Sequence, residues 1–351
     1  LRMMARLLAP AMRRLFPEIP TEHPAMGAMI MNISANMLGL GNAATPFGVR
    51  AMEALATLTP TTGIATRSMI MFLAINTSCI TLFPTGVIAL RMAVGSHHAA
   101  AIMHTTLVAS GCAMVTAIVS VFLLQRWYQA SEPEIITPQD YQSDTAPQEQ
   151  HAAYPAWGVI LFLISFAALL IVLTQGGPSA SAWVVPCMTM GFLTFGCLRK
   201  VAIYEQFVEG AKEGVQVALR IIPYLVTMLV CIGMLRASGA LFVIAQFLSP
   251  VTNWIGLPAE ALPLALMRPL SGSGSYGLLA GLLNDPNIGP DSYIGYLVST
   301  LQGSTETTFY VMAVYFGAVK ITKLRYAILA GLLADLGGIL GSVLAVRWLL
   351  S

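Results

Sequence analysis

Long apolar blocks separated by short polar stretches make up most of this chain. Blocks of this length and hydropathy predict helices in a membrane rather than strands, because each is too long for a buried strand and carries few charges. The expected helical segments are Ala25–Leu40, Ser68–Ala93, His104–Leu124, Trp157–Thr174, Ala182–Leu198, Ile221–Leu235, Leu262–Leu283, Tyr293–Val319 and Tyr326–Leu344. Residues Tyr204–Gln216 carry four charges on an apolar background and predict a helix at the membrane surface.

Four of these blocks contain a polar interruption. The interruptions are Gly39–Pro46, Asn76–Ser78 with Pro84 beyond it, Arg268–Ser275, and Gly303–Thr308. Backbone groups at membrane depth must be satisfied by protein, water or solute, so such interruptions are typical of discontinuous or re-entrant helices. We therefore expect broken helices at Asn32–Asn42 and at Arg268–Gly277.

Composition agrees with a membrane protein. Of the 351 residues, 56% are hydrophobic and 10% are charged, and the mean hydropathy is +0.74. Soluble domains average about 25% charged residues. The expected fold class is an all-α polytopic membrane protein. The net charge of +2 gives no reason to expect a nucleic-acid partner.

The expected division of the chain is a first repeat over 1–125, a polar linker over 126–155 and a second repeat over 156–351. The two repeats echo each other in sequence. Pro24 aligns with Pro263 and Asn32 with Ser271, and the triplet Asn76–Ser78 aligns with Gly303–Thr305. In the same alignment Ser34 pairs with Ser273, Asn36 with Ser275, Thr81 with Thr308, Arg268 with Met29 and Glu306 with Cys79. We expect two pseudo-symmetric, inverted repeats with unequal chemistry.

The polar residues of the interruptions are the candidate binding site. Ser, Thr and Asn supply both donors and acceptors, which suits a neutral polar organic solute. Glu306 is the central residue, because a carboxylate in hydrocarbon costs at least about 2.5–3.5 kcal/mol and normally marks a site or pathway. The candidate ligand-binding residues are Asn32, Asn36, Asn42, Asn76, Thr77, Ser78, Arg268, Ser271, Ser273, Ser275, Gln302, Ser304, Thr305, Glu306 and Thr308.

Two plainer interpretations compete with a site. Glu306 and Arg268 could form a buried structural ion pair. Small residues could serve only for close helix packing, which is the preferred interpretation for Gly331, Gly337, Gly338 and Gly341.

Two sets of motifs carry a family resemblance. Residues 1–124 resemble the spore maturation protein A family, and residues 200–349 resemble the spore maturation protein B family. The motifs are Arg13–Pro20 and Met31–Pro46 in the first half, and Ala265–Gly274 and Gly303–Tyr310 in the second. The whole resembles a fused A–B form with the nucleoside-recognition or gate domain, which is similar to the core of concentrative nucleoside transporters and to part of ferrous-iron permeases.

The resemblance implies an inverted-repeat core with paired re-entrant hairpins, in a multi-pass protein of the bacterial inner membrane. It implies no particular solute. By symmetry with the helix and span that precede the second repeat, we expect a comparable surface helix and span to precede Leu1.

Three function classes remain open at this point. The favoured one is a membrane transporter or solute-binding protein for a small polar, nucleoside-like solute, with Na⁺ or H⁺ coupling through Glu306. The second is a non-transporting envelope or spore-maturation scaffold. The third, an intramembrane serine enzyme using Ser273 or Ser304, is disfavoured because no histidine lies in either polar motif. We expect no enzyme activity, no metal and no cofactor, and as partners the lipid bilayer, the solute and further copies of the chain.

Overall fold

The computed structural model describes residues 10–20, 23–39, 44–59, 63–128 and 254–349, with scattered positions between 186 and 252. The predicted linker beyond residue 128, the predicted span Trp157–Thr174, about half of Ala182–Leu198, most of Ile221–Leu235, and Asn42 lie outside the described residues. Within the described residues, 203–212 form an exposed helix in the predicted surface segment.

The described part is helical. Its first half contains α2 (Pro24–Met37), α3 (Thr45–Ala56), α4 (Arg67–Thr77), α5 (Thr85–Ala93) and α6 (Ile102–Gln125), with a short 3-10 turn, η2 (Ala99–Ala101), before α6. Its second half contains η4 (Ala259–Ala261), α11 (Leu262–Met267), α12 (Gly272–Leu283), α13 (Tyr293–Ser304), α14 (Thr308–Ala318) and α15 (Ala327–Leu349). Two of the described helices are long and apolar enough to cross a membrane, α6 with its preceding turn and α15.

Local sequence explains where these helices begin. Side-chain oxygens of Thr66, Ser271 and Ser292 cap α4, α12 and α13 by accepting N–H groups of the first turn at 2.9–3.2 Å. Such caps satisfy donors that a helix start would otherwise leave unpaired. Proline stands in the first turn of α2, α3 and α11, where its missing N–H costs nothing.

The polar interruptions are true helix breaks. The predicted block Ser68–Ala93 divides into α4 and α5, and Tyr293–Val319 divides into α13 and α14. The predicted broken segment Asn32–Asn42 contains the end of α2 at Met37, although Asn32 and Asn36 themselves lie inside the continuous helix. The break itself follows at Gly39, whose φ of +72° favours glycine and whose Cβ, if present, would lie against the Phe83 carbonyl.

The order of helices in the second half repeats that of the first, and matched hydrogen bonds fix the correspondence. Leu82 N–H donates to the Met37 carbonyl at 2.9 Å, and Phe309 N–H donates to the Pro269 carbonyl at 3.0 Å. Met37 therefore corresponds to Pro269. This corrects the sequence alignment of Arg268 with Met29, since Arg268 corresponds to Asn36.

The error came from assuming helices of equal length. Helix α2 has 14 residues and α11 has 6, so an alignment that starts at Pro24 and Pro263 drifts before the break is reached. Beyond the break, α3 and α12 have 12 residues each and align from end to end. The pairings of Asn32 with Ser271, Ser34 with Ser273 and Asn36 with Ser275 are therefore wrong, because these serines lie at the start of α12.

Two apolar cores form, and each mixes both halves. One core contains α2, α3 and α4 together with α14, through Val311, Met312 and Phe316. The other contains α11, α12 and α13 together with α5, through Val87 and Ile88. Helices α5 and α14 are thus exchanged, since each packs in the core of the opposite half.

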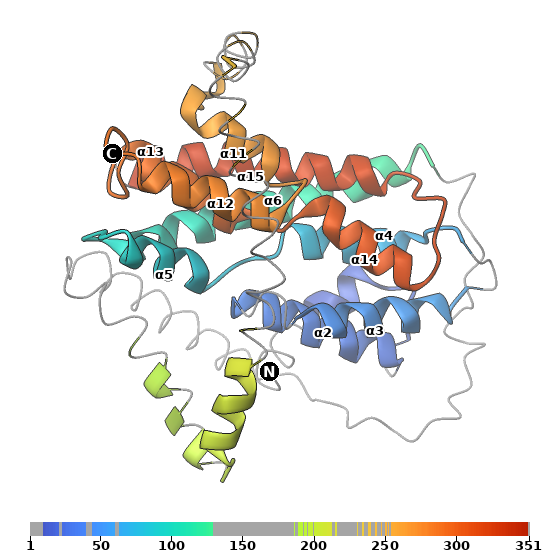
Figure 1. Cartoon of the computed structure of the whole chain (residues 1–351). Coiled ribbons are helices and arrows are strands. Elements are labelled where there is room, and N and C mark those ends of the chain that lie inside the picture. Colours follow the sequence, from blue (N-terminus) through green and yellow to red (C-terminus); the bar gives the residue numbers. More distant parts are fainter. Residues whose placement is uncertain are drawn as a thin grey trace.

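The two long helices α6 and α15 pack side by side and join the cores (Figure 1). Glycines allow their close approach. A Cβ on Gly337 would meet the Thr116 side chain at 2.4 Å, and a Cβ on Gly341 would meet Cys112 Cβ at 2.7 Å. The packing interpretation of these glycines is confirmed. Gly338 differs, because its added Cβ would meet Thr305 and Ser304 at the α13–α14 break.

Candidate functional site

The two breaks that follow α4 and α13 touch each other. The backbone N–H of Glu306 donates to the carbonyl of Thr77 at 2.7 Å. Thr77 is the last residue of α4, and Glu306 lies between α13 and α14. Residues that lie far apart in the sequence are thus brought together, with polar clusters on either side of the contact.

Three buried asparagines form the first cluster, on the α2–α4 side. Asn36 Nδ2 donates to Asn76 Oδ1 at 3.0 Å, and Asn76 Nδ2 donates to Asn32 Oδ1. Asn32 Nδ2 also donates to the Ala44 carbonyl at 2.8 Å, which ties the cluster to the start of α3. Three of the predicted site residues, Asn32, Asn36 and Asn76, thus lie in contact with one another.

Tyr315 closes this cluster from α14 of the opposite half. Its hydroxyl accepts from Asn32 Nδ2 at 3.1 Å and lies 3.4 Å from Asn76 Oδ1. Its ring stacks on Phe72 and lies against Gly48, where a Cβ would overlap the ring. The sequence analysis missed Tyr315, although a tyrosine is a signal of a buried hydrogen bond in an apolar helix.

Arg268 organises the second cluster, at the end of α11. Its guanidinium donates to the Thr305 carbonyl through one terminal nitrogen and to Thr307 Oγ1 at 3.1 Å through the other. Gly272 makes room for this arrangement, because a Cβ there would meet Thr307 Oγ1 at 2.7 Å. Arg268 therefore holds the α13–α14 break through its hydrogen bonds, and the side chain is buried.

The Glu306 carboxylate lies at the edge of this cluster. Its Oε2 is 3.7 Å from an Arg268 terminal nitrogen, and its side chain is 42% exposed. A long, half-exposed ion pair contributes little to stability, so the interpretation of Glu306 as half of a tight structural pair is weakened.

Asp335 is a further carboxylate at the breaks. Thr308 Oγ1 donates to Asp335 Oδ2 at 2.6 Å, which connects the first residue of α14 to the middle of α15. Asp335 is 5% exposed. Asp335 was not among the predicted site residues, although an ionisable group in an apolar span is itself a signal of a functional role.

The other predicted residues have more local roles. Thr77, Ser78, Ser275 and Ser304 turn their hydroxyls back to carbonyls of their own helices at 2.7–3.0 Å. Ser271 caps α12, and the Ser273 hydroxyl lies 3.5 Å from that of Ser271. Gln302 is buried in α13, and neither of its amide atoms has a partner among the described residues.

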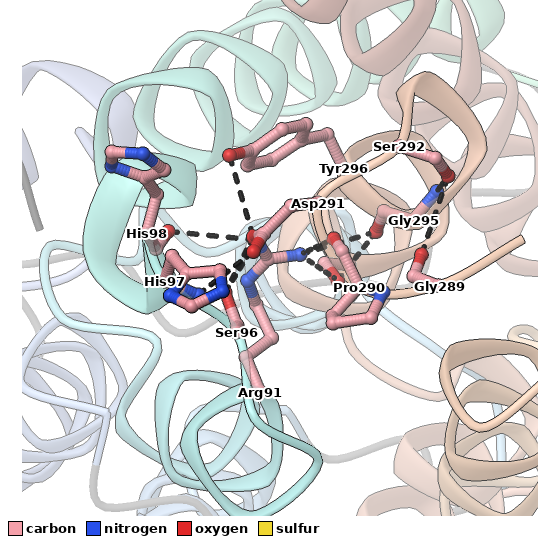
Figure 2. Close-up of polar contacts among 11 residues, drawn as sticks. Arg91, Ser96, His97, His98, Gly289, Pro290, Asp291, Ser292, Gly295 and Tyr296 are labelled. Atoms are coloured by element: carbon pink, nitrogen blue, oxygen red, sulfur yellow. Dashed lines mark hydrogen bonds and ion pairs between the residues drawn. The ribbon is translucent and has the colours of Figure 1, made fainter.

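A separate polar cluster links the halves away from the breaks (Figure 2). Arg91 is fully buried and donates to the Pro290 carbonyl at 2.7 Å, Ser299 Oγ at 3.1 Å and Asp291 Oδ1 at 2.9 Å. Asp291 also accepts from Ser96 Oγ at 2.6 Å and from His97 N–H at 2.7 Å. This cluster was not predicted, because Arg91 of α5, Ser299 of α13 and the loop residues between them belong to no polar motif.

Burial raises the pKa of Asp291, but the hydrogen bonds from Ser96 and His97 and the positive charge of Arg91 lower it by more, so the net shift is downward. The carboxylate is therefore the form that the cluster binds. The arrangement fastens the end of α5 to the start of α13 and serves the fold rather than a solute.

Comparison with known proteins agrees with this architecture. A family model described as Gate, nucleoside recognition, matches residues 1–94 and 218–322, which contain α2–α5 and α11–α14. Spore maturation protein B of Bacillus subtilis (strain 168) is 51% identical over 165 residues, covering 47% of this chain and 92% of that protein. Spore maturation protein A of the same strain is 49% identical over 115 residues, covering 33% of this chain and 59% of that protein. No solved structure matches the chain.

The matched family segments cover the exchanged helices α5 and α14. They also cover the breaks after α2 and α4 and those after α11 and α13, and they stop before α6 and α15. A match of this extent, together with relatives at about half identity, is decisive. The chain belongs to the nucleoside-recognition Gate family.

Proposed function

We propose that this protein is a membrane transporter or solute-binding protein for a small polar organic solute of nucleoside-like chemistry. The observation that carries the proposal is the contact between the two breaks, in which Glu306 N–H meets the Thr77 carbonyl. In transporters built from two repeats, substrate sites lie where discontinuous helices meet, because the polar groups at their ends can bind solute.

The chemistry beside this contact suits a solute with several donors and acceptors. The asparagine cluster offers amides of both kinds, and Tyr315 adds a hydroxyl. Arg268 and Glu306 add opposite charges within 3.7 Å of each other. A sugar or a base could replace the hydrogen bonds that these groups now make with one another.

Binding requires the breaks to separate. The cavity beside Arg268 measures about 10 Å³, which is room for about one water molecule. We propose that the two halves are related by a pseudo-twofold axis in the membrane plane, and that relative movement of the halves opens the site alternately to each side. The exchanged helices α5 and α14 would couple that movement between the two cores.

The cellular setting belongs to the same proposal. We place the protein in the bacterial inner membrane, with several spans, as a homo-oligomer. Na⁺ or H⁺ coupling would use Glu306, the half-exposed carboxylate at the contact. The protein is not an enzyme in this proposal, since Ser273 and Ser304 have no base among their described contacts.

The test is uptake of radiolabelled nucleosides, amino acids and short peptides into proteoliposomes, after a thermal-shift screen of the same compounds. We expect at least one nucleoside-like compound to raise the melting temperature and to be taken up. Asn76→Ala should abolish both effects, and Glu260→Gln, at an exposed carboxylate outside the site, should abolish neither. Thermal stabilisation without uptake would favour a solute-binding scaffold. Covalent labelling of Ser273 or Ser304 by a serine-reactive probe would favour the enzyme.

A further inference from the structure

Among the described residues, only one of the two oxygens of the Asp335 carboxylate accepts a hydrogen bond. Its Oδ2 accepts from Thr308 Oγ1, and the Thr305 side chain approaches the same carboxylate. Its Oδ1 is buried, and no donor among the described residues meets it at hydrogen-bonding geometry. A buried charged oxygen without a donor is costly, so a further group is expected beside it.

Arg268 has the complementary gap. Its two terminal nitrogens are used at the break, but its Nε is buried and has no acceptor among the described residues. Arg268 and Asp335 line the same cavity, together with Ser304 and Thr305. Among the described residues, Arg268 forms an ion pair with Glu306 and none with Asp335. A donor and an acceptor thus border one small space without touching.

The size of that space identifies what fits. At about 10 Å³ it holds about one water molecule and no organic solute. Water can accept from a guanidinium and donate to a carboxylate at the same time. A metal cation is disfavoured, because the Arg268 charge lines the same cavity.

The first half shows what this position needs for structure alone. Thr81 corresponds to Thr308, and its backbone N–H donates to Ser110 Oγ of α6 at 3.3 Å. Ser110 is thus a neutral side chain of α6 that contacts the break at Thr81, as Asp335 of α15 contacts the break at Thr308. Since a neutral hydroxyl suffices to join break and long helix there, the charge of Asp335 has another purpose. The two halves thus differ in charge. The second half has Asp335 and Arg268 beside its break, and the first half has the neutral residues Ser110 and Asn36.

We propose that the cavity between α11, α13 and α15 is a water site, and that through this water Asp335, rather than Glu306, is the counter-ion of Arg268. The buried pair is neutral as a whole, and both orphaned atoms gain hydrogen bonds. Glu306 then has no obligatory partner. If the proposed transport function holds, Glu306 is the carboxylate that can leave Arg268 and bind the solute or a coupling ion instead.

A double-mutant cycle tests the pairing through melting temperature in detergent. Asp335→Asn preserves the acceptor for Thr308 and removes only the charge. We expect it to lower the melting temperature by about 5 °C or more, because Arg268 is left buried and uncompensated. The double variant Asp335→Asn/Arg268→Gln should have a loss of melting temperature much smaller than the sum of the losses of the two single variants. The matched cycle of Glu306→Gln with Arg268→Gln should be close to additive.

Additivity of the Asp335 cycle, or stronger coupling in the Glu306 cycle, would overturn the proposal. Infrared spectra give a second readout that needs no unfolding. Asp335 is ionised in this proposal. The infrared spectrum of the wild type at neutral pH should therefore contain no buried carboxylic-acid band from Asp335, and the spectrum of Asp335→Asn should have lost none. Such a band, or Na⁺-dependent stabilisation that Asp335→Asn abolishes, would also overturn it. None of these readouts depends on transport, so failure of uptake alone leaves the pairing intact.

Discussion

Glu306 donates its backbone N–H to the carbonyl of Thr77 at 2.7 Å, and this contact connects the break after α4 to the break after α13. The asparagine cluster lies on one side and Arg268 on the other. The contact uses only backbone atoms, so the Glu306 side chain is left for other interactions. Its carboxylate is half exposed and 3.7 Å from Arg268.

Replacing Glu306 by Gln should separate coupling from stability. We expect a change in the free energy of unfolding of no more than about 1 kcal/mol, since exposed ion pairs contribute little. Solute binding should persist, and ion- or pH-dependent uptake should be lost. Melting temperature and uptake are measured on one preparation. Normal coupled uptake would remove Glu306 from the mechanism, and a large loss of stability would restore the structural pair.

Removing Asn76 should destabilise the asparagine cluster. Asn76→Ala leaves Asn36 Nδ2 and Asn32 Oδ1 buried without their present partners, at about 1–3 kcal/mol for each unsatisfied group. Tyr315→Phe is the milder comparison, because it keeps the ring stacked on Phe72 and should cost about 1 kcal/mol. Chemical denaturation monitored by tryptophan fluorescence measures both. An Asn76→Ala variant as stable as the wild type would show that the cluster does not hold α2 to α4.

Replacing a glycine of the two long helices by alanine should lower the stability at Gly341, where α15 contacts α6, but not at Gly111. An added Cβ at Gly341 would lie 2.7 Å from Cys112 Cβ and 3.1 Å from the Ala109 backbone, so we expect Gly341→Ala to cost about 1–3 kcal/mol. Gly111 on α6 has no atom within 4 Å of such a Cβ. Gly111→Ala should gain up to about 1 kcal/mol from helix propensity. Equal melting temperatures for the two variants would contradict the close packing of α6 on α15.

Acid should weaken the Arg91–Asp291 cluster. The pKa of Asp291 is lower in the folded chain than in the unfolded chain, where it is about 3.9. Its contribution to stability is therefore fully present above the unfolded value and is lost as the pH falls through the folded value. Asp291→Asn should cost about 1–3 kcal/mol at neutral pH through its weakened bond to Arg91. The gap in melting temperature between wild type and variant should close on acidification, and a gap that is constant with pH would contradict this.

The sequence predicted the helix breaks well because their cause is local. Polar triplets, glycines and prolines within apolar blocks interrupt a helix where they stand, so the sequence itself indicates the position of each break. The two long helices were also predicted, as His104–Leu124 and Tyr326–Leu344, and the structure extends them to Ile102–Gln125 and Ala327–Leu349.

Side-chain partners were harder to predict, since they depend on which halves exchange helices. Tyr315 reaches Asn32 only because α14 packs in the core of the first half. Asp335 of α15 accepts from Thr308 at the start of α14, and the unequal lengths of α2 and α11 displaced the predicted repeat. Hydrophobic periodicity contains no information about such pairings.

The exchange of α5 and α14 also has a consequence for biosynthesis. Val87 and Ile88 of α5 are buried against residues of α11–α13, which a ribosome makes long after α5. At usual synthesis rates of about 5–20 residues per second, that delay is on the order of ten seconds or more. During this time the first half has an uncovered apolar helix and an incomplete core without α14. We therefore expect lipid, an insertase or a chaperone to shield α5 until the second half has been made.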